Sequence, residues 1–314
     1  MKIGTWILVL MAILLSPPVG AASLFGPPSF YGPVYSTPRS VALGDLDGDK
    51  DLDMVLSLKP YDKVAVLLGN GDGTFSSGST LFPAGESPMF VILEDVNEDD
   101  NLDAVVANSL ASVVSVLLGN GDGSFQAPST YGEIDADALA VAAGYLNNDS
   151  HLDLVTVNTQ RNNVSVLLGV GDGTFPTSVN YDAGEDCRGL ALGDLDGDGF
   201  VDIVTANHDG NNISVLLGNG DGTFLAPSTS PVGQWPISVA LGHLNQDPAL
   251  DIVVTNYGDN TATILLNQGN GSFQDAGTIA TGGQPISSVI GRVDYDDNND
   301  LAIANADTND VSIH

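Results

Sequence analysis

The chain has few basic residues, one cysteine and no long hydrophobic run beyond its first residues. Only eight of its 314 residues are Lys or Arg, against 40 Asp or Glu, so the formal net charge is −32 at pH 7. Nucleic acid is therefore excluded as a partner, because phosphate binding needs clustered basic side chains. Cys187 is the only cysteine, so no intrachain disulfide can form, and stability must come from packing, bound metal or both.

Residues 1–22 are expected to be a signal peptide. Lys2 precedes an apolar run over residues 5–15, and small residues follow up to Ala22, which is typical of a secretory signal cleaved after Ala21 or Ala22. A membrane anchor is the alternative, but the run is too short to span a bilayer, and no later segment has ~18 consecutive apolar residues. We therefore expect no membrane insertion, and a secreted, periplasmic or cell-surface location; the oligomeric state stays open.

Six related segments fill the remaining chain, residues 23–314. They begin at residues 41, 91, 141, 190, 239 and 288, so each repeat is 49 or 50 residues long. The fourth begins LALGDLDGDGFVD at Leu190, and a second motif, LLGNGDGTF at Leu216, recurs in phase with the first. Two motifs in step indicate one repeated structural unit.

Each unit contains four short apolar runs rich in Val, Ile and Leu, separated by Gly, Asp and Asn. This spacing is typical of strands and not of helices. Runs such as DIVTAN (202–207) are almost continuously apolar, so both of their faces must be covered. The sequence predicts an all-β fold, a single β-propeller domain of six four-stranded blades; a β-solenoid is the alternative.

The chain ends are expected to complete the sixth blade together. Residues 24–36 resemble the last strand of a unit, whereas the C-terminal stretch Ala302–His314 stops after a third strand. We predict that the N-terminal strand closes the ring beside the C-terminal one. A truncated seven-bladed propeller is the alternative.

The first turn of each unit carries a cluster of aspartates. Carboxylates at loop positions 1, 3, 5 and 9, with a carbonyl at position 7, match the hard oxygen ligands of Ca²⁺. We predict about three Ca²⁺ sites, with a solvated turn as the alternative. Their residues are Asp45, Asp47, Asp49, Asp51 and Asp53; Asp95, Asn97, Asp99, Asn101 and Asp103; and Asp194, Asp196, Asp198, Phe200 and Asp202.

The other three loops are incomplete. Their first position is Tyr145, His243 or Arg292, none of which is a good calcium ligand. We expect Asx-type hydrogen bonds to hold these turns without metal.

The segments GDLDGDGFVDIVTAN and LLGNGDGTF resemble the FG-GAP repeats of the integrin α-chain N-terminal β-propeller. They are more similar still to bacterial FG-GAP/VCBS-type repeats. The resemblance covers Leu24 to His314. It implies a calcium-bearing β-propeller used in adhesion or ligand binding.

The second turns and the links between units are expected to form a ligand face. In an up-and-down blade they lie opposite the first and third turns, which carry the aspartates and the GNGDGTF motif. Aromatic and amide side chains suit a sugar or a peptide, although the asparagines could instead only cap turns. The predicted residues are Tyr61, Asn108, Asn158, Asn207, His208, Trp235, Asn256, Tyr257 and Asn305.

No catalytic motif stands out in the chain. HExxH, GxSxG and nucleophile patterns are missing from the sequence. We expect a binding module for an extracellular protein or glycan and no enzyme. A polysaccharide-active lyase or glycosidase on the same scaffold is the alternative.

Overall fold

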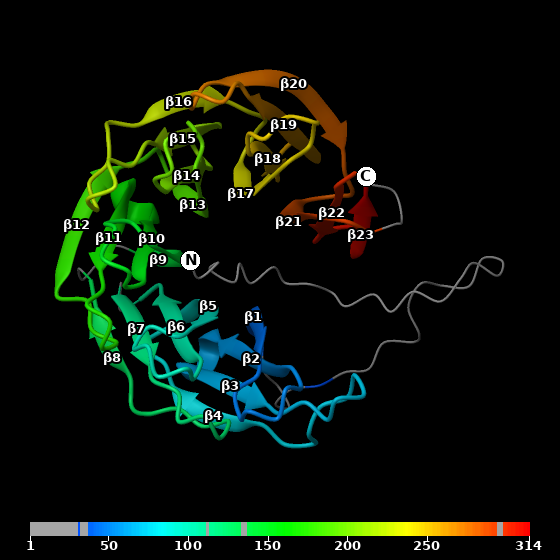
Figure 1. Ribbon diagram of the computed structural model, residues 1–314. Coiled ribbons are helices and arrows are strands. Elements are labelled where there is room, and N and C mark those ends of the chain that lie inside the picture. Colours follow the sequence, from blue (N-terminus) through cyan, green and yellow to red (C-terminus); the bar gives the residue numbers. More distant parts are fainter. Residues whose placement is uncertain (1–30, 32–36, 111–112, 133–136, 294–297) are drawn as a thin grey trace.

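The computed structural model describes residues 31, 37–110, 113–132, 137–293 and 298–314. They form six antiparallel sheets that follow one another around an arc as the blades of a β-propeller (Figure 1). The prediction of an all-β propeller is confirmed. Within these residues, no helix has the length and apolarity that a membrane crossing requires.

The strands follow the predicted repeat. Blade I contains β1 (Pro38–Gly44), β2 (Asp53–Leu58), β3 (Lys63–Leu67) and β4 (Thr80–Pro83), and blade II contains β5 (Pro88–Glu94), β6 (Asp103–Asn108), β7 (Val113–Leu117) and β8 (Ser129–Tyr131). Blade III contains β9 (Ala138–Gly144), β10 (Asp153–Asn158), β11 (Asn163–Leu168) and β12 (Thr177–Asp182), and blade IV contains β13 (Cys187–Gly193), β14 (Asp202–Asn207), β15 (Asn212–Leu216) and β16 (Ser228–Pro231). Blade V contains β17 (Pro236–Gly242), β18 (Asp251–Asn256), β19 (Thr261–Asn267) and β20 (Phe273–Ala280), and blade VI contains β21 (Pro285–Gly291), β22 (Asp300–Asn305) and β23 (Asp310–Ile313). Two single-turn 3₁₀ helices lie in second turns, η1 (Lys59–Tyr61) and η2 (Thr159–Arg161).

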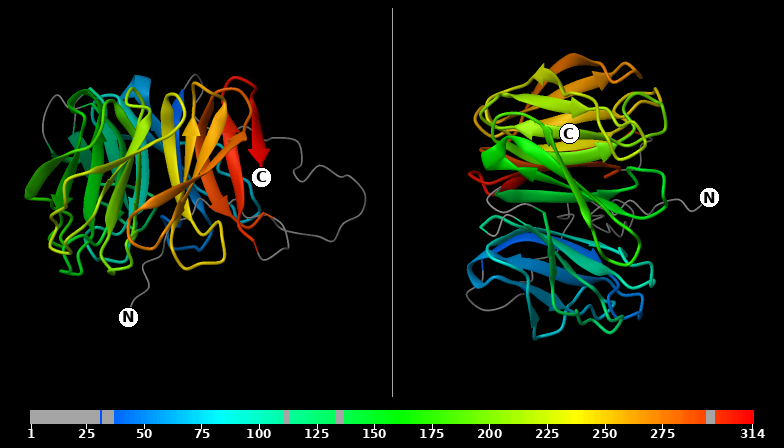
Figure 2. Two further views of the ribbon diagram at one scale, coloured as in Figure 1. Left: turned by 90° about the horizontal axis from the view of Figure 1, so that it is seen from above. Right: turned by 90° about the vertical axis from the view of Figure 1, so that its left-hand side faces the viewer.

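Each sheet pairs its strands in chain order, with the first strand innermost and the fourth on the outside (Figure 1). In blade IV, β14 lies between β13 and β15, with Gly193 opposite Asp202 and Asn207 opposite Asn212. The turns gather on two opposite faces of the ring (Figure 2). The first and third turns of a blade therefore share one face, and its second turn and link share the other.

The hydrophobic core lies between the blades. Each of the first five cores joins side chains of two adjacent blades. The second strands β6, β10, β14 and β18 are buried along their whole length. This agrees with their continuous apolar sequences, because a strand packed between two neighbouring blades has no solvent-facing side.

Closure of the ring falls mostly outside the described residues, as does the predicted signal peptide. Blade VI has three described strands, and of residues 24–36 the structure describes only Tyr31. The Tyr31 ring meets Phe75 edge-to-face, with centroids 5.4 Å apart. The same contact joins the fourth strand of one blade to the third turn of the next at Phe82–Phe125, Tyr131–Phe175 and Tyr181–Phe224. Tyr31 thus occupies the place of a fourth-strand aromatic ahead of blade I.

Candidate functional site

The ninth residue of each loop begins the second strand and braces two turns. In blade I both carboxylate oxygens of buried Asp53 accept backbone hydrogen bonds, one from Leu46 N–H and one from Gly69 N–H, each at 2.8 Å. The same pair of bonds recurs at Asp103, Asp153, Asp202 and Asp251. The ninth aspartate is therefore a structural clamp in complete and incomplete loops alike. Sequence reasoning missed this role, because one partner lies 16 residues further along the chain.

Two of the three complete loops gather carboxylates closely enough to share one ion. Ligand atoms of Asp45, Asp47 and Asp53 lie within 4.8 Å of one another. The fifth-position residue, Asp49, is not in this group, and its Oδ1 accepts the N–H of Asp51 at 2.8 Å. Blade IV repeats the arrangement, with its group formed by Asp194, Asp196 and Asp202, and with Asp198 accepting the N–H of Phe200 at 2.8 Å. An all-oxygen set of this kind fits Ca²⁺ chemically.

The loop of blade II has the same turn with an amide at its third position. The Asp99 N–H donates to Asp95 Oδ1 at 3.1 Å, and Asn97 Nδ2 donates to Asp99 Oδ2 at 3.0 Å. The N–H of Asn101 donates to Asp99 Oδ1 at 2.9 Å. With Asp103 at position nine, this loop offers three carboxylates and one amide carbonyl.

The incomplete loop of blade V keeps its turn through side-chain hydrogen bonds, as expected. The Asp247 N–H donates to Asn245 Oδ1 at 2.7 Å, and the Ala249 N–H donates to Asp247 Oδ1 at 3.0 Å. His243, at position one, places its Nδ1 3.0 Å from the Ala249 carbonyl oxygen. This histidine supports the turn at the position where a complete loop has its first carboxylate.

Burial and like charge act together on the clamp carboxylates. Burial raises the pKa of Asp103 and of Asp202 to about 6, although two backbone hydrogen bonds oppose it in each case. Burial also raises the pKa of Asp53, and the nearby charges of Asp47 and Asp49 raise it further. A bound cation would relieve both effects, because it favours the ionised form of every carboxylate around it.

Hydrogen bonds join the face of the loops from blade to blade. The N–H of Gly123, in the third turn of blade II, donates to the carbonyl of Leu46 in the loop of blade I at 2.9 Å. Equivalent bonds run from Gly173 to Val96, from Gly222 to Leu146 and from Gly271 to Leu195. This face is thus a continuous backbone framework, which we call the loop face.

The opposite face carries, within the part of the chain that the structure describes, five repeated corners, which we call corner bridges. In each, a link residue with φ between 53° and 59° accepts, at its carbonyl, the N–H of the residue that follows the second strand. Both residues carry side chains that differ from blade to blade. The pairs are Ser87 and Ser109, Asp137 and Thr159, Asp186 and His208, Trp235 and Tyr257, and Gln284 and Ala306.

The five asparagines predicted for the ligand face are buried instead. Asn207 Nδ2 donates to Asn212 Oδ1 at 2.7 Å and to Ser214 Oγ at 2.9 Å, and its Oδ1 accepts from Thr205 Oγ1 at 2.9 Å. A Cβ on Gly184, in the link above, would overlap this amide. The prediction that these amides face a ligand is wrong, because they brace the second turn from inside. It concerned Asn108, Asn158, Asn207, Asn256 and Asn305, which are at most 3% exposed.

The other predicted ligand-face residues reach the surface. Trp235 is 48% exposed and Tyr61 is 46% exposed, whereas His208 and Tyr257 are largely buried but still accessible. The Trp235 indole stacks on the His208 ring, with centroids 5.8 Å apart and planes 12° from parallel. Two neighbouring corner bridges thus meet through their side chains.

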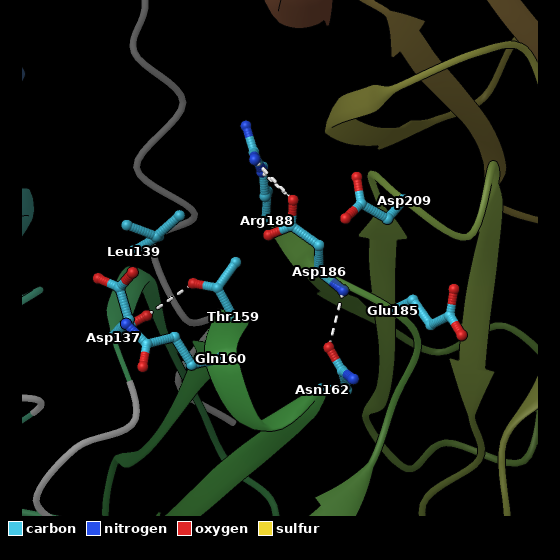
Figure 3. A pocket seen from close by; sticks show the side chains of 9 residues that line it. All are labelled: Asp137, Leu139, Thr159, Gln160, Asn162, Glu185, Asp186, Arg188 and Asp209. Atoms are coloured by element: carbon cyan, nitrogen blue, oxygen red, sulfur yellow. Dashed lines mark hydrogen bonds and ion pairs between the residues drawn. The ribbon is translucent and has the colours of Figure 1, made fainter.

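A hollow of about 420 Å³ lies on this face between blades III and IV. Figure 3 shows the side chains around it, with Asp137 and Thr159 on one side and Asp186, Arg188 and Asp209 on the other. Arg188 donates to Asp186 Oδ2 from Nη2 at 2.6 Å and from Nε at 3.0 Å. The remaining lining residues are Leu139, Gln160, Asn162 and Glu185. Four carboxylates against one guanidinium make the hollow acidic.

Repeated blades with acidic first-turn loops define a class of β-propeller, and comparison with known proteins identifies the family. Residues 45–106, 95–156, 146–205 and 194–254 each match the FG-GAP-like repeat, and together these segments cover more than half of the chain. The chain therefore belongs to the family of FG-GAP-like repeat proteins, as the sequence motifs indicated. No protein with a curated description matches it in sequence.

Solved structures share the fold at low identity. One is a lectin from Agrocybe aegerita that recognises non-reducing terminal N-acetylglucosamine, with 18% identity, a TM-score of 0.59, and 86% of this chain and 75% of that chain covered. Another is virginiamycin B lyase from Staphylococcus aureus, with 11% identity, a TM-score of 0.57, and coverage of 89% and 84%. A third is a putative 6-phosphogluconolactonase from Bacteroides fragilis, with 16% identity, a TM-score of 0.64, and coverage of 88% and 79%. Binding proteins and enzymes thus share this fold, so function has to be argued from the side chains.

Proposed function

We propose that the protein is an exported calcium-binding β-propeller that acts as an adhesion or ligand-binding module. Its ligand is an extracellular protein or glycan, held on the face of the corner bridges. The observation that carries the proposal is the contrast within each corner bridge between a constant backbone hydrogen bond and variable side chains. A rigid framework with variable surface residues is how many scaffolds present a binding site.

Calcium is proposed to stabilise the loop face. The residues that would hold it are those of the complete loops in blades I, II and IV. Within the blade I loop, and likewise within the blade IV loop, three acidic ligand atoms lie within 4.8 Å of one another. The ion would supply the positive charge that offsets carboxylate repulsion. Extracellular Ca²⁺ modules bind with dissociation constants of about 0.1–1 mM, so the loops would fill outside the cell.

Side chains on the face of the corner bridges support a binding role. Among the described residues that line the hollow, Thr159 is the only one with a hydroxyl, and that hydroxyl donates to the Asp137 carbonyl at 2.8 Å. It is therefore poorly placed to act as a nucleophile. The exposed aromatic surface of Trp235 suits stacking against a sugar or an aromatic side chain. The lectin among the structural relatives supports a glycan as one ligand class.

The proposal is tested by screening the protein against glycan and protein arrays in about 1 mM Ca²⁺. Trp235→Ala and Tyr257→Ala should weaken binding to a ligand found this way without lowering the melting temperature. Asp198→Ala should lower the melting temperature and leave binding by the folded protein intact. The opposite pattern, with binding lost only in Asp198→Ala, would show that the ligand lies on the loop face.

A further inference from the structure

We propose that Asp186, His208 and Asp209 form a second type of metal site, on the face opposite the calcium loops. It would take a borderline divalent ion of the Zn²⁺ class, not Ca²⁺. The ligand atoms of these three residues lie within 4.8 Å of one another. One imidazole with two carboxylates is a donor set that suits Zn²⁺, Co²⁺, Ni²⁺ or Cu²⁺, whereas Ca²⁺ takes oxygen alone.

The distances suit one shared ion. His208 Nδ1 lies 2.8 Å from Asp209 Oδ1 and 3.1 Å from Asp186 Oδ2. Ligands held at 2.0–2.1 Å around a tetrahedral Zn²⁺ lie about 3.3 Å apart. The two distances from His208 Nδ1 therefore differ from this value by about half an ångström or less, and the third pair, Asp186 and Asp209, lies within 4.8 Å.

The backbone fixes the three residues before any ion arrives. The His208 N–H donates to the Asp186 carbonyl at 3.0 Å, and the Asp209 N–H donates to the Glu185 carbonyl at 3.2 Å. The Asp186 N–H in turn donates to Asn162 Oδ1 at 2.8 Å. Both the corner bridge and the neighbouring second turn therefore hold the cluster in place.

Trp235 and Arg188 contact the cluster and restrict its side chains. The Trp235 indole stacks on the His208 ring and restricts its rotation, and the His208 side chain is only 15% exposed. Arg188 donates two hydrogen bonds to Asp186 Oδ2, as outer-shell partners commonly do for ligating carboxylates. Without a metal, the same groups form a hydrogen-bonded network around Asp186, which is the competing explanation.

Among the described blades, only the corner bridge of Asp186 and His208 combines a histidine with two aspartates. The equivalent pairs elsewhere contain no histidine, and only Asp307 repeats the position of Asp209, donating its N–H to the Gly283 carbonyl at 3.0 Å. Asp186 and Asp209 also line the hollow. Coordination positions left free by the protein would therefore face a space large enough for water or a ligand donor.

Trp235 provides a direct readout. The chain has two tryptophans, so Trp6→Phe leaves Trp235 as the only one. We would titrate this full-length protein, saturated with Ca²⁺, with Co²⁺ or Cu²⁺ and follow fluorescence quenching, and measure Zn²⁺ binding by calorimetry. Saturable quenching and one Zn²⁺ per chain that excess Ca²⁺ does not displace are the expected results.

Matched variants locate the ion. His208→Gln and Asp209→Asn should each weaken Zn²⁺ binding at least tenfold and abolish the saturable quenching, while His243→Gln and Asp307→Asn should change neither. Circular dichroism melting in Ca²⁺ would show that all four variants are folded. Unchanged Zn²⁺ affinity in His208→Gln, displacement by Ca²⁺, or absence of saturable quenching would each overturn the proposal and leave the cluster as a hydrogen-bonded network alone.

Discussion

The buried asparagine at the end of each second strand can be tested by a nearly isosteric change, Asn207→Asp. Asn207 Nδ2 donates to Asn212 Oδ1 and Ser214 Oγ, and the Asn207 side chain is fully buried. An ionised aspartate cannot donate, and it would place a charge against the acceptor Asn212 Oδ1. We therefore expect a large loss of stability at neutral pH.

The magnitude follows from two contributions. Two lost hydrogen bonds cost about 1–3 kcal/mol. At the other end of β14, burial raises the pKa of Asp202 to about 6 even though two backbone N–H groups bond to it. A similar rise of about two units at residue 207 would cost about 3 kcal/mol at pH 7. The total is about 4–6 kcal/mol, or a fall of roughly 10 °C in melting temperature.

The pH dependence has a definite sign. A carboxyl whose pKa is raised in the folded protein destabilises it fully above the folded-state pKa, and this cost falls as pH drops towards the unfolded-state pKa. At pH 5, midway between the unfolded and folded pKa values, about half of the ionisation cost remains, so the deficit of Asn207→Asp relative to wild type should shrink to about 2–4 kcal/mol. Calorimetric melting of both proteins at pH 7 and pH 5 measures this difference in stability.

The control is Asn211→Asp. Asn211 is exposed, and its Oδ1 accepts the Trp235 N–H at 2.9 Å, a role that an aspartate can keep. This variant should lie within about 0.5 kcal/mol of wild type. Equal stability of Asn207→Asp and Asn211→Asp at pH 7 would refute the bracing role of the buried amide.

Three further outcomes are expected. Removing Ca²⁺ with EDTA should lower the melting temperature, because one site filled at ten times its dissociation constant contributes about 1.4 kcal/mol. Asp198→Ala should reduce this shift in melting temperature, and Asp247→Ala should not. Equal shifts in the two variants would count against the assignment of calcium to the complete loops. Burial raises the pKa of the Cys187 thiol to about 11, so iodoacetamide should label the unfolded protein and spare the native one at pH 8; rapid native labelling would show that this corner opens. Tyr31 and Phe75 should show a coupling energy of about 0.5–1.5 kcal/mol in a double-mutant cycle of stability. Zero coupling would mean that the Tyr31–Phe75 contact gives no support to closure of the ring by the N-terminal strand.

The strand order could be predicted because burial leaves a strong trace in the sequence. DIVTAN is apolar at nearly every position, and the corresponding strand β14 is buried on both faces between neighbouring blades. The loop aspartates were equally visible, because Asx turns and oxygen ligands need them at alternate positions.

The roles of buried polar groups could not be predicted in the same way. Its position in the chain places Asn207 beside a turn, but its partner Ser214 lies on the next strand. The sequence does not show whether the Asn207 amide points to solvent or into the blade. Asp202 posed the same problem, since one of its hydrogen bonds comes from Gly218. Long-range partners decide both cases, and a single sequence holds no record of them.

The two metal sites proposed for blade IV, the calcium loop and the His208 corner, lie at opposite ends of the blade. Their separation has a measurable consequence. Asp202 begins β14 and Asn207 ends it, so about 16 Å of strand divides the calcium loop from the His208 corner. Sites this far apart that share no partner change stability additively. The rise in melting temperature with Ca²⁺ and Zn²⁺ together should equal the sum of the separate rises. A combined rise clearly larger than this sum would mean that the two sites are coupled. The simplest cause would be that β14, which joins them, shifts between two arrangements that both ions favour differently.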